Sequence, residues 1–146
     1  MDERKFQVQL KIRKPVAEVF NAVVDPKTLT RYFVQTSSGP LVEGATVKWV
    51  FAEAQDHPFD VIVREVRKNE RVVLEWPGGH GYQTSVTMEF KPLDGENTMV
   101  QISESGWHAD SPLSLACGNA GGWMHMMCCL KALLEYDVRL RAGGAR

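Results

Sequence analysis

Alternation of apolar and polar residues predicts a strand near the start of the chain. From Phe6 to Arg13 every second residue is apolar, which is typical of a strand with one face on a core. In residues 15–25 the apolar positions instead recur every three or four residues, and this spacing predicts a helix. Asp25-Pro26 ends this helix and begins a short second one, which we expect to run to about Tyr32.

The middle of the chain is predicted to form strands connected by turns. Residues 45–53, 57–76 and 82–106 alternate in the same way, and the two longer segments contain turn-forming residues that divide each into a hairpin. We expect loops at 36–44 and at Pro77–Gly81. The side chains predicted to face the inside of the sheet are Val47, Trp49, Phe51, Val63, Leu74, Trp76, Tyr82, Thr84, Val86, Met88, Ile102 and Glu104.

The last predicted element is a long helix. We expect it to begin at or just after Ser111-Pro112 and to end before Gly143. It should be unbroken from about Asn119 to about Leu140. At 100° per residue, the face predicted to cover the sheet carries Trp123, Met127, Leu130 and Leu134.

This order of elements predicts an α+β fold in which an antiparallel sheet packs on the terminal helix. The chain has 146 residues and contains neither a repeat nor a linker, so we predict one domain, 1–146. Its formal net charge of −1 provides no field that would gather nucleic acid.

The sequence also excludes a membrane span and indicates a cytoplasmic protein. No apolar run approaches the roughly 18 residues that a span needs, and the N-terminal residues alternate instead of forming a signal peptide. The cysteines number three, and neither this odd count nor their spacing builds a disulfide framework.

A metal site is the alternative explanation for the segment His125–Cys129. His125 and Cys129 have the i, i+4 spacing of two ligands, and Cys128 lies beside them. A structural zinc needs four ligands, usually from two separate clusters, and the sequence contains no second cluster. We therefore predict no metal site. No phosphate loop or hydrolase motif is present either, so we predict no cofactor and name no catalytic residue.

Four segments resemble one protein family and together cover most of the chain. They are KPVAEVFNAVVDPKTLTRYF (14–33), VIVREVRKNERVVLEW (61–76), SVTMEFKPLDGENTMVQISESGW (85–107) and GGWMHMMCCLKALLE (121–135). They are similar to the activator of heat-shock-protein-90 ATPase-like branch of the START/Bet v 1-like superfamily, also called SRPBCC. The resemblance implies a helix-grip fold, in which a curved antiparallel sheet wraps around the C-terminal helix and leaves a cavity between them.

The resemblance also implies what such a cavity holds. Members of the superfamily bind lipids, hormones and polyketides, and some cyclise or dehydrate them. The chaperone activators of the family carry an additional N-terminal domain, whereas this sequence begins directly with its first strand. A small apolar or amphipathic molecule is therefore the expected partner, and a chaperone is the alternative. The sequence does not indicate an oligomeric state.

Three hypotheses of function follow. The first is a binding protein whose ligand lies between the sheet and the terminal helix. The second is a cyclase, dehydratase or hydrolase that uses Glu104 with Tyr82 or His108 as its acid and base. The third is a regulatory module that interacts through its surface. The residues predicted to bind the ligand are Trp49, Phe51, Trp76, Tyr82, Thr84, Glu104, His108, Trp123 and Met127.

Overall fold

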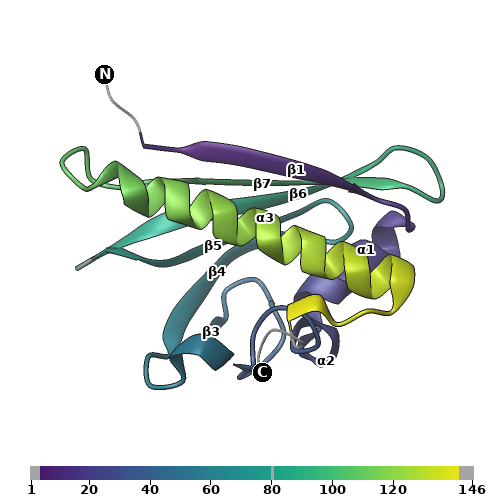
Figure 1. The fold of residues 1–146 in the computed structure, drawn as a ribbon, viewed down its shortest axis with the longest axis horizontal. Helices are drawn as coiled ribbons and strands as arrows, with labels where there is room; N and C mark the ends of the chain where they lie inside the picture. The colour runs from purple at the N-terminus through teal and green to yellow at the C-terminus, as the bar shows by residue number, and fades with distance from the viewer. Residues whose placement is uncertain (1–3, 80, 142–146) are drawn as a thin grey trace.

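One antiparallel sheet and one long helix dominate the structure, a computed structural model that describes residues 4–79 and 81–141 (Figure 1). The elements are β1 (Phe6–Ile12), α1 (Val16–Val24), α2 (Pro26–Leu29), β2 (Thr36–Ser37), β3 (Thr46–Val50), the 3-10 helix η1 (Ala52–Ala54), β4 (Phe59–Arg67), β5 (Arg71–Gly79), β6 (Tyr82–Pro92), β7 (Thr98–Ser105) and α3 (Leu113–Tyr136). This arrangement confirms the predicted α+β helix-grip fold.

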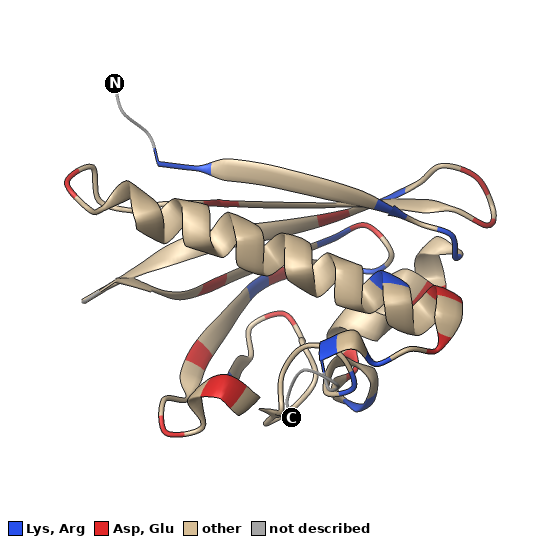
Figure 2. Cartoon of the chain, in the orientation of Figure 1, with Lys and Arg blue, Asp and Glu red and all other residues tan. Residues whose placement is uncertain are grey.

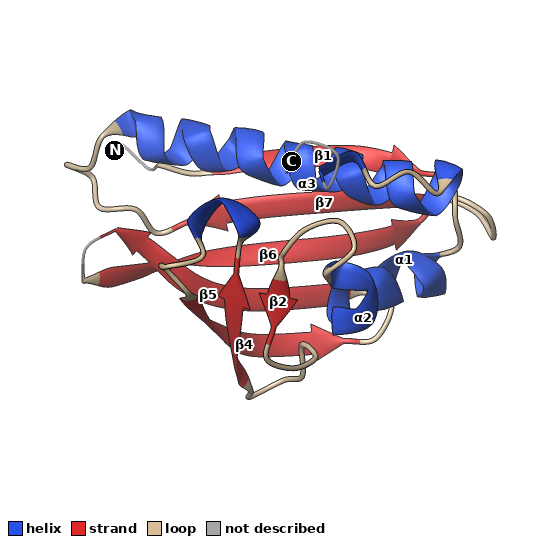
Figure 3. Ribbon diagram, turned by 60° about the horizontal axis from the view of Figure 1, so that its bottom comes forward, coloured by secondary structure: helices blue, strands red, loops and turns tan. Residues whose placement is uncertain are grey.

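The seven strands lie in the order β1-β7-β6-β5-β4-β3-β2, and every neighbouring pair is antiparallel. The first strand lies beside the last, with Phe6 paired to Glu104. Helix α3 runs along one face of the sheet on the side of β1 and β7, and α1 and α2 lie near its C-terminal end (Figures 1 and 3). The half of the sheet formed by β3, β4 and β5 therefore extends beyond the helix.

The predicted alternation of the sheet residues is confirmed. Most of the side chains expected inside are buried, among them Trp49, Thr84 and Glu104. Phe51, Trp76 and Tyr82 are only half-buried. The strand predicted over 45–53 is shorter than expected, because β3 ends at Val50 and Ala52–Ala54 form η1, so Phe51 lies just outside the sheet. Phe51 and Trp76 are accessible where α3 leaves the sheet uncovered.

Two predicted loops differ from the structure. The segment 36–44 contains the two-residue strand β2, which pairs with β3. The predicted loop Pro77–Gly81 is largely strand, because β5 continues to Gly79 and pairs there with Tyr82 of β6. A Cβ at Gly78 would overlap the methyl group of Thr84, so glycine at this position lets the two strands stay paired over a buried threonine. His80, also within that predicted loop, lies outside the described residues.

Both predicted helix ends were placed too late in the sequence. The second helix ends at Leu29 instead of Tyr32. Helix α3 ends at Tyr136 instead of Leu140, because Asp137 adopts the left-handed conformation (φ 55°, ψ 38°) and its N–H donates to the Leu133 carbonyl at 2.9 Å. Aspartate tolerates this conformation better than most residues, and it ends helices in the way that glycine commonly does.

The buried face of α3 largely matches the prediction. Trp123, Met127 and Leu130 are buried, and Leu134 is half-buried. Cys129, which is not part of the predicted apolar face, is also fully buried. Within the described ranges, no helix combines the length and apolar character that a membrane crossing requires.

Glu135 fastens the end of α3 to the segment after β1. Its carboxylate accepts the backbone N–H of Arg13 and the Arg13 Nε–H, each at 2.8 Å, and the Lys131 ammonium at 2.6 Å. Burial acts to raise the pKa of Glu135, but these hydrogen bonds outweigh it and lower the pKa to about 2. The ionised carboxylate therefore stabilises the contact between α3 and the segment that connects β1 to α1.

Replacing Leu130 by alanine should lower the free energy of unfolding by about 2–5 kcal/mol, because it leaves a cavity at a fully buried site. The control is Cys128→Ser, at a partly exposed position on the same helix, for which we expect about 0.5 kcal/mol or less. Urea denaturation measures both. A Leu130→Ala loss as small as that of the control would contradict the orientation of α3.

Replacing Glu135 by glutamine should remove a pH-dependent part of the stability. The carboxyl has a lower pKa when folded than the roughly 4.3 of an unfolded chain, so its contribution is present above about pH 5 and is lost as the pH falls through about 2. The variant should be less stable by about 1.5–3 kcal/mol at pH 7. The difference between the two proteins should shrink steadily between pH 5 and pH 2, and a constant difference would contradict the assignment.

Candidate functional site: an aromatic recess beside a buried carboxylate

Glu104 is the one buried residue of the described chain with a carboxylate, and it is only 1% exposed. Its Oε1 accepts the indole N–H of Trp123 at 2.9 Å, and its Oε2 accepts that of Trp76 at 2.9 Å and the Thr84 hydroxyl at 2.5 Å. The Asn119 amide nitrogen lies 3.2 Å from both oxygens. Four side chains from β5, β6 and α3 thus converge on one side chain of β7.

These contacts explain how the carboxylate is tolerated in the interior. A buried carboxylate costs several kcal/mol unless its lone pairs are filled. The indole and amide N–H groups can only donate, and an ionised carboxylate can only accept. These donors therefore suit a Glu104 side chain that accepts hydrogen bonds through both of its oxygens. Hydrogen bonds to a charged acceptor are also stronger than those between neutral groups.

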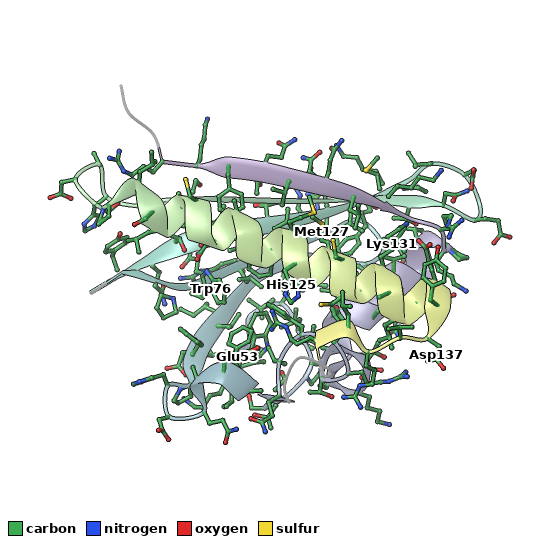
Figure 4. All side chains as sticks on the ribbon, in the orientation of Figure 1. Glu53, Trp76, His125, Met127, Lys131 and Asp137 are labelled. Atoms are coloured by element: carbon green, nitrogen blue, oxygen red, sulfur yellow. The ribbon has the colours of Figure 1, made fainter. Side chains whose placement is uncertain are left out.

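Two of the four donors belong to tryptophans whose rings line a recess at the surface. This aromatic recess has a volume of about 150 Å³ and lies between α3, β5 and the segments before and after β3. Its lining residues are Phe33, Phe51, Glu53, Trp76, Asn119, Gly122, Trp123 and Arg141. Figure 4 labels Glu53 and Trp76, which come from η1 and β5 and lie on the same side of α3.

The aromatic rings of the recess hold each other in place. Phe33 packs on Trp123 at 5.5 Å and on Phe51 at 5.1 Å, and Trp76 packs on Trp123 at 5.2 Å between ring centroids. Trp49 lies behind them, fully buried and in edge contact with Trp76. The walls of the recess are therefore rigid before any ligand arrives.

A second hollow continues the recess toward β4. This outer hollow has a volume of about 300 Å³ and shares Phe51, Glu53, Trp76 and Asn119 with the recess. Phe59 and Pro77 extend its lining. The two together form an apolar groove with polar atoms only at a few positions.

Of the residues predicted to bind a ligand, the structure brings Phe51, Trp76 and Trp123 together in the lining of the recess. Glu104 and Thr84 lie buried beneath these rings. Trp49 and Met127 belong to the core behind the recess and are fully buried.

Tyr82 and His108 lie apart from this site. Their rings stack on each other at 3.7 Å. Among the described residues, neither of them is a hydrogen-bond partner of Glu104, which bonds instead to tryptophan, threonine and asparagine. The structure therefore does not form the acid–base pairing of Glu104 with Tyr82 or His108 that the enzyme hypothesis used.

Sequence reasoning missed Phe33, Glu53, Asn119, Gly122 and Arg141. Asn119 precedes Trp123 by one helical turn, so the i, i+4 spacing could have placed both on one face of α3. Gly122 lies on α3 beside Trp123. The positions of Phe33, Glu53 and Arg141 depend on how segments outside the main strands and α3 return to the sheet, for which the sequence pattern gives no signal.

His125 and Cys129 contact each other. The Arg141 guanidinium lies 3.2 Å from His125 Nδ1, and since it can only donate, Nδ1 is an acceptor. The hydrogen is then on Nε2, which faces the Cys129 sulfur at 3.6 Å. Burial raises the pKa of the Cys129 thiol. Across the described residues, no three His, Cys, Asp or Glu side chains are grouped to hold a metal.

Replacing Glu104 by glutamine should destabilise the protein by about 2–4 kcal/mol, because the new amide group would face N–H groups that also donate. The control is Ser105→Ala, the exposed neighbour on the same strand, which should change the free energy of unfolding by about 0.5 kcal/mol at most. Urea denaturation followed by near-ultraviolet circular dichroism measures both. Equal stability of the two variants would contradict the network.

Several solved structures share this fold. DynU16, a protein of the dynemicin biosynthetic locus, is 24% identical with a TM-score of 0.82, and the match covers 94% of this chain but only 49% of DynU16. The chain thus spans about half the length of DynU16. The Aha1 dimer from Colwellia psychrerythraea is 20% identical, with a TM-score of 0.75 over 90% of this chain and 96% of that one.

A third structure is PFC0360w, an HSP90 activator from Plasmodium falciparum. It is 20% identical with a TM-score of 0.72, and it too is matched over 90% of this chain and 96% of its own. At such identities the likeness establishes the fold alone.

The family itself is established by the sequence. No curated protein matches the chain significantly. Residues 13–135, however, match the family described as Activator of Hsp90 ATPase homolog 1-like protein, and this range includes Glu104 and every donor to it. The resemblance noted from four sequence segments is therefore confirmed. The chain belongs to the Activator of Hsp90 ATPase homolog 1-like family, within the Bet v 1-like superfamily.

Proposed function

We propose that this protein binds a small apolar or amphipathic molecule in the aromatic recess and the outer hollow. The observation that carries the proposal is a recess lined by four aromatic rings, those of Phe33, Phe51, Trp76 and Trp123. Phe51 and Trp76 are partly exposed there, whereas Phe33 and Trp123 are buried behind them. Partly exposed rings at a concave site favour an apolar ligand, because its binding removes their surface from water.

The size of the site limits the ligand. Volumes of about 150 and 300 Å³ in two adjoining hollows accommodate a body of two or three rings, or a short alkyl chain. Each buried CH₂ contributes about 0.8 kcal/mol before ordering costs. A ligand of this size can therefore reach micromolar affinity, which corresponds to about −8 kcal/mol.

The state of Glu104 favours binding over catalysis. A general acid or base must reach the ligand, whereas this carboxylate is buried and accepts from Trp76, Thr84, Asn119 and Trp123. Its role in the proposal is to hold the edges of the two indoles, so that both rings keep their places in the lining of the recess.

Titration with small aromatic and aliphatic ligands tests the proposal through tryptophan emission. The panel contains flavonoids, fatty acids and the neutral probe N-phenyl-1-naphthylamine. Trp76 and Trp123 line the recess, so binding should quench or shift the emission saturably. Trp107 instead packs on Phe6 at 5.9 Å, and a Trp107→Phe variant should keep the response.

Gly122→Phe should block binding, since Gly122 lines the recess on α3 and an added Cβ meets no atom within 4 Å. Its matched control is Gly121→Phe, which also has free space around an added Cβ and is not among the lining residues. Both changes should leave stability equal or slightly higher, because phenylalanine has a higher helix propensity than glycine.

We expect Gly122→Phe to weaken binding at least tenfold, a loss of about 1.4 kcal/mol, and Gly121→Phe to leave it unchanged. No saturable response from any ligand, or equal weakening by both variants, would contradict the proposal. An interaction role through the protein surface would then be the better hypothesis.

A further inference from the structure

A third hollow beside the aromatic recess is lined by arginines. This arginine pocket has a volume of about 240 Å³, and Arg31, Arg139 and Arg141 all line it, together with Thr30 and Gln35. Arg31 follows α2, whereas the other two arginines follow α3. In Figure 2 basic residues of these two segments lie close together beside α2. The chain as a whole carries a net charge of only −1, so this concentration of positive charge is local.

Two of the three guanidinium groups, those of Arg139 and Arg141, donate to backbone carbonyls, and that of Arg141 also contacts His125 Nδ1 at 3.2 Å. Arg139 Nε donates to the Arg31 carbonyl at 3.1 Å, and Arg141 Nη1 donates to the Phe33 carbonyl at 2.7 Å. Arg31 has an ion pair, with Asp137 at 3.4 Å, but the Asp137 side chain is 88% exposed. Such a pair is weak in water.

Arg139 and Arg141 have no carboxylate within ion-pair distance among the residues that the structure describes. The Nε of Arg141 is moreover buried without any hydrogen-bond partner in the same set. A buried donor without an acceptor is unfavourable, and an anionic ligand would supply both an acceptor and a counter-charge.

The arginine pocket adjoins the aromatic recess directly. Phe33 and Arg141 line both of them. The Arg141 guanidinium lies over the Phe33 ring at 5.4 Å and over the Phe51 ring at 5.9 Å. A molecule that extends from the recess past these side chains therefore meets the arginines.

The sign of the charged lining residues differs between the two ends of the three hollows. Glu53 lines the recess and the outer hollow but not the arginine pocket, whereas Arg141 lines the recess and the arginine pocket but not the outer hollow. An anionic group is repelled at one end of the groove and attracted at the other. This asymmetry orients a ligand that is charged at one end.

We infer that the ligand is an amphipathic anion, with an apolar ring system in the aromatic recess and a carboxylate, sulfonate or phosphate group in the arginine pocket. The inference rests on the proposed function, because it names the chemical class of the molecule that the recess binds. Guanidinium groups suit such anions, since they donate paired hydrogen bonds to two oxygens of one group.

A pair of fluorescent probes with the same rings tests the inference. N-phenyl-1-naphthylamine is neutral, and 8-anilinonaphthalene-1-sulfonate adds one sulfonate to the same rings. We expect the sulfonate to bind about tenfold more tightly at low salt, in line with the strength of charge-assisted hydrogen bonds, and to lose this advantage as salt is added. Gly122→Phe should weaken both probes.

Arg139→Gln distinguishes the two parts of the site, because Arg139 lines the arginine pocket and not the recess. It should weaken the sulfonate about tenfold and leave the neutral probe unchanged. Lys68→Gln is the control, since it removes the same charge from an exposed turn between β4 and β5 and lines none of the three hollows. It should affect neither probe.

Each other outcome overturns a different claim. Equal affinity of the two probes, with no effect of Arg139→Gln, would overturn the anionic class and leave the recess as the binding site. Sulfonate binding that Arg139→Gln weakens but Gly122→Phe does not would mean that the arginine pocket binds anions on its own, and inorganic phosphate should then displace the probe. Failure of both probes to bind would overturn the proposed function and this inference together.

Discussion

The hydrogen bonds to one buried carboxylate hold the sheet, the terminal helix and the recess in a fixed relation. Glu104 of β7 accepts from Trp76 of β5, Thr84 of β6, and Asn119 and Trp123 of α3. Because the charge is buried, a movement of any one of these elements would leave it with an unfilled lone pair at a cost of a few kcal/mol. The position of α3 is therefore determined by polar groups as well as by its apolar face, and a helix held by apolar contacts alone could slide with less penalty.

The same network explains why the recess is both aromatic and rigid. Each indole has a polar edge and two apolar faces, and Glu104 takes up the polar edges of Trp76 and Trp123. Both rings line the recess, and Trp123 packs between Phe33 and Trp76. A ligand that enters does not need to order these rings, so less of its binding energy is lost on entropy. The polar and apolar parts of the site thus depend on each other, although they come from distant parts of the sequence.

Most of the fold could be predicted from the sequence because alternation in strands and helical spacing are local signals. These signals predicted the strands of the sheet, the inward orientation of Glu104 and the face of α3 that covers the sheet. They could not show whether the end of β7 opens to solvent, since that depends on Trp76 and Trp123 approaching from other elements. They also placed the end of α3 too late, because the apolar pattern continues past Asp137 while a single left-handed residue ends the helix. The arginine pocket was missed for a related reason, since its members are near neighbours only after two loops have folded.

The turn at Asp137 also determines which part of the surface is basic. A helix rotates its side chains by about 100° with each residue, so an α3 longer by one residue would carry Arg139 and Arg141 to another side of the molecule. By ending the helix where it does, Asp137 returns the chain toward Phe33, whose carbonyl then accepts from Arg141. The residue at which α3 ends therefore determines whether Arg139 and Arg141 point into water on another side of the molecule or lie together beside the aromatic rings. A relative that carries the same arginines but one inserted residue before them would keep the fold and lose the pocket.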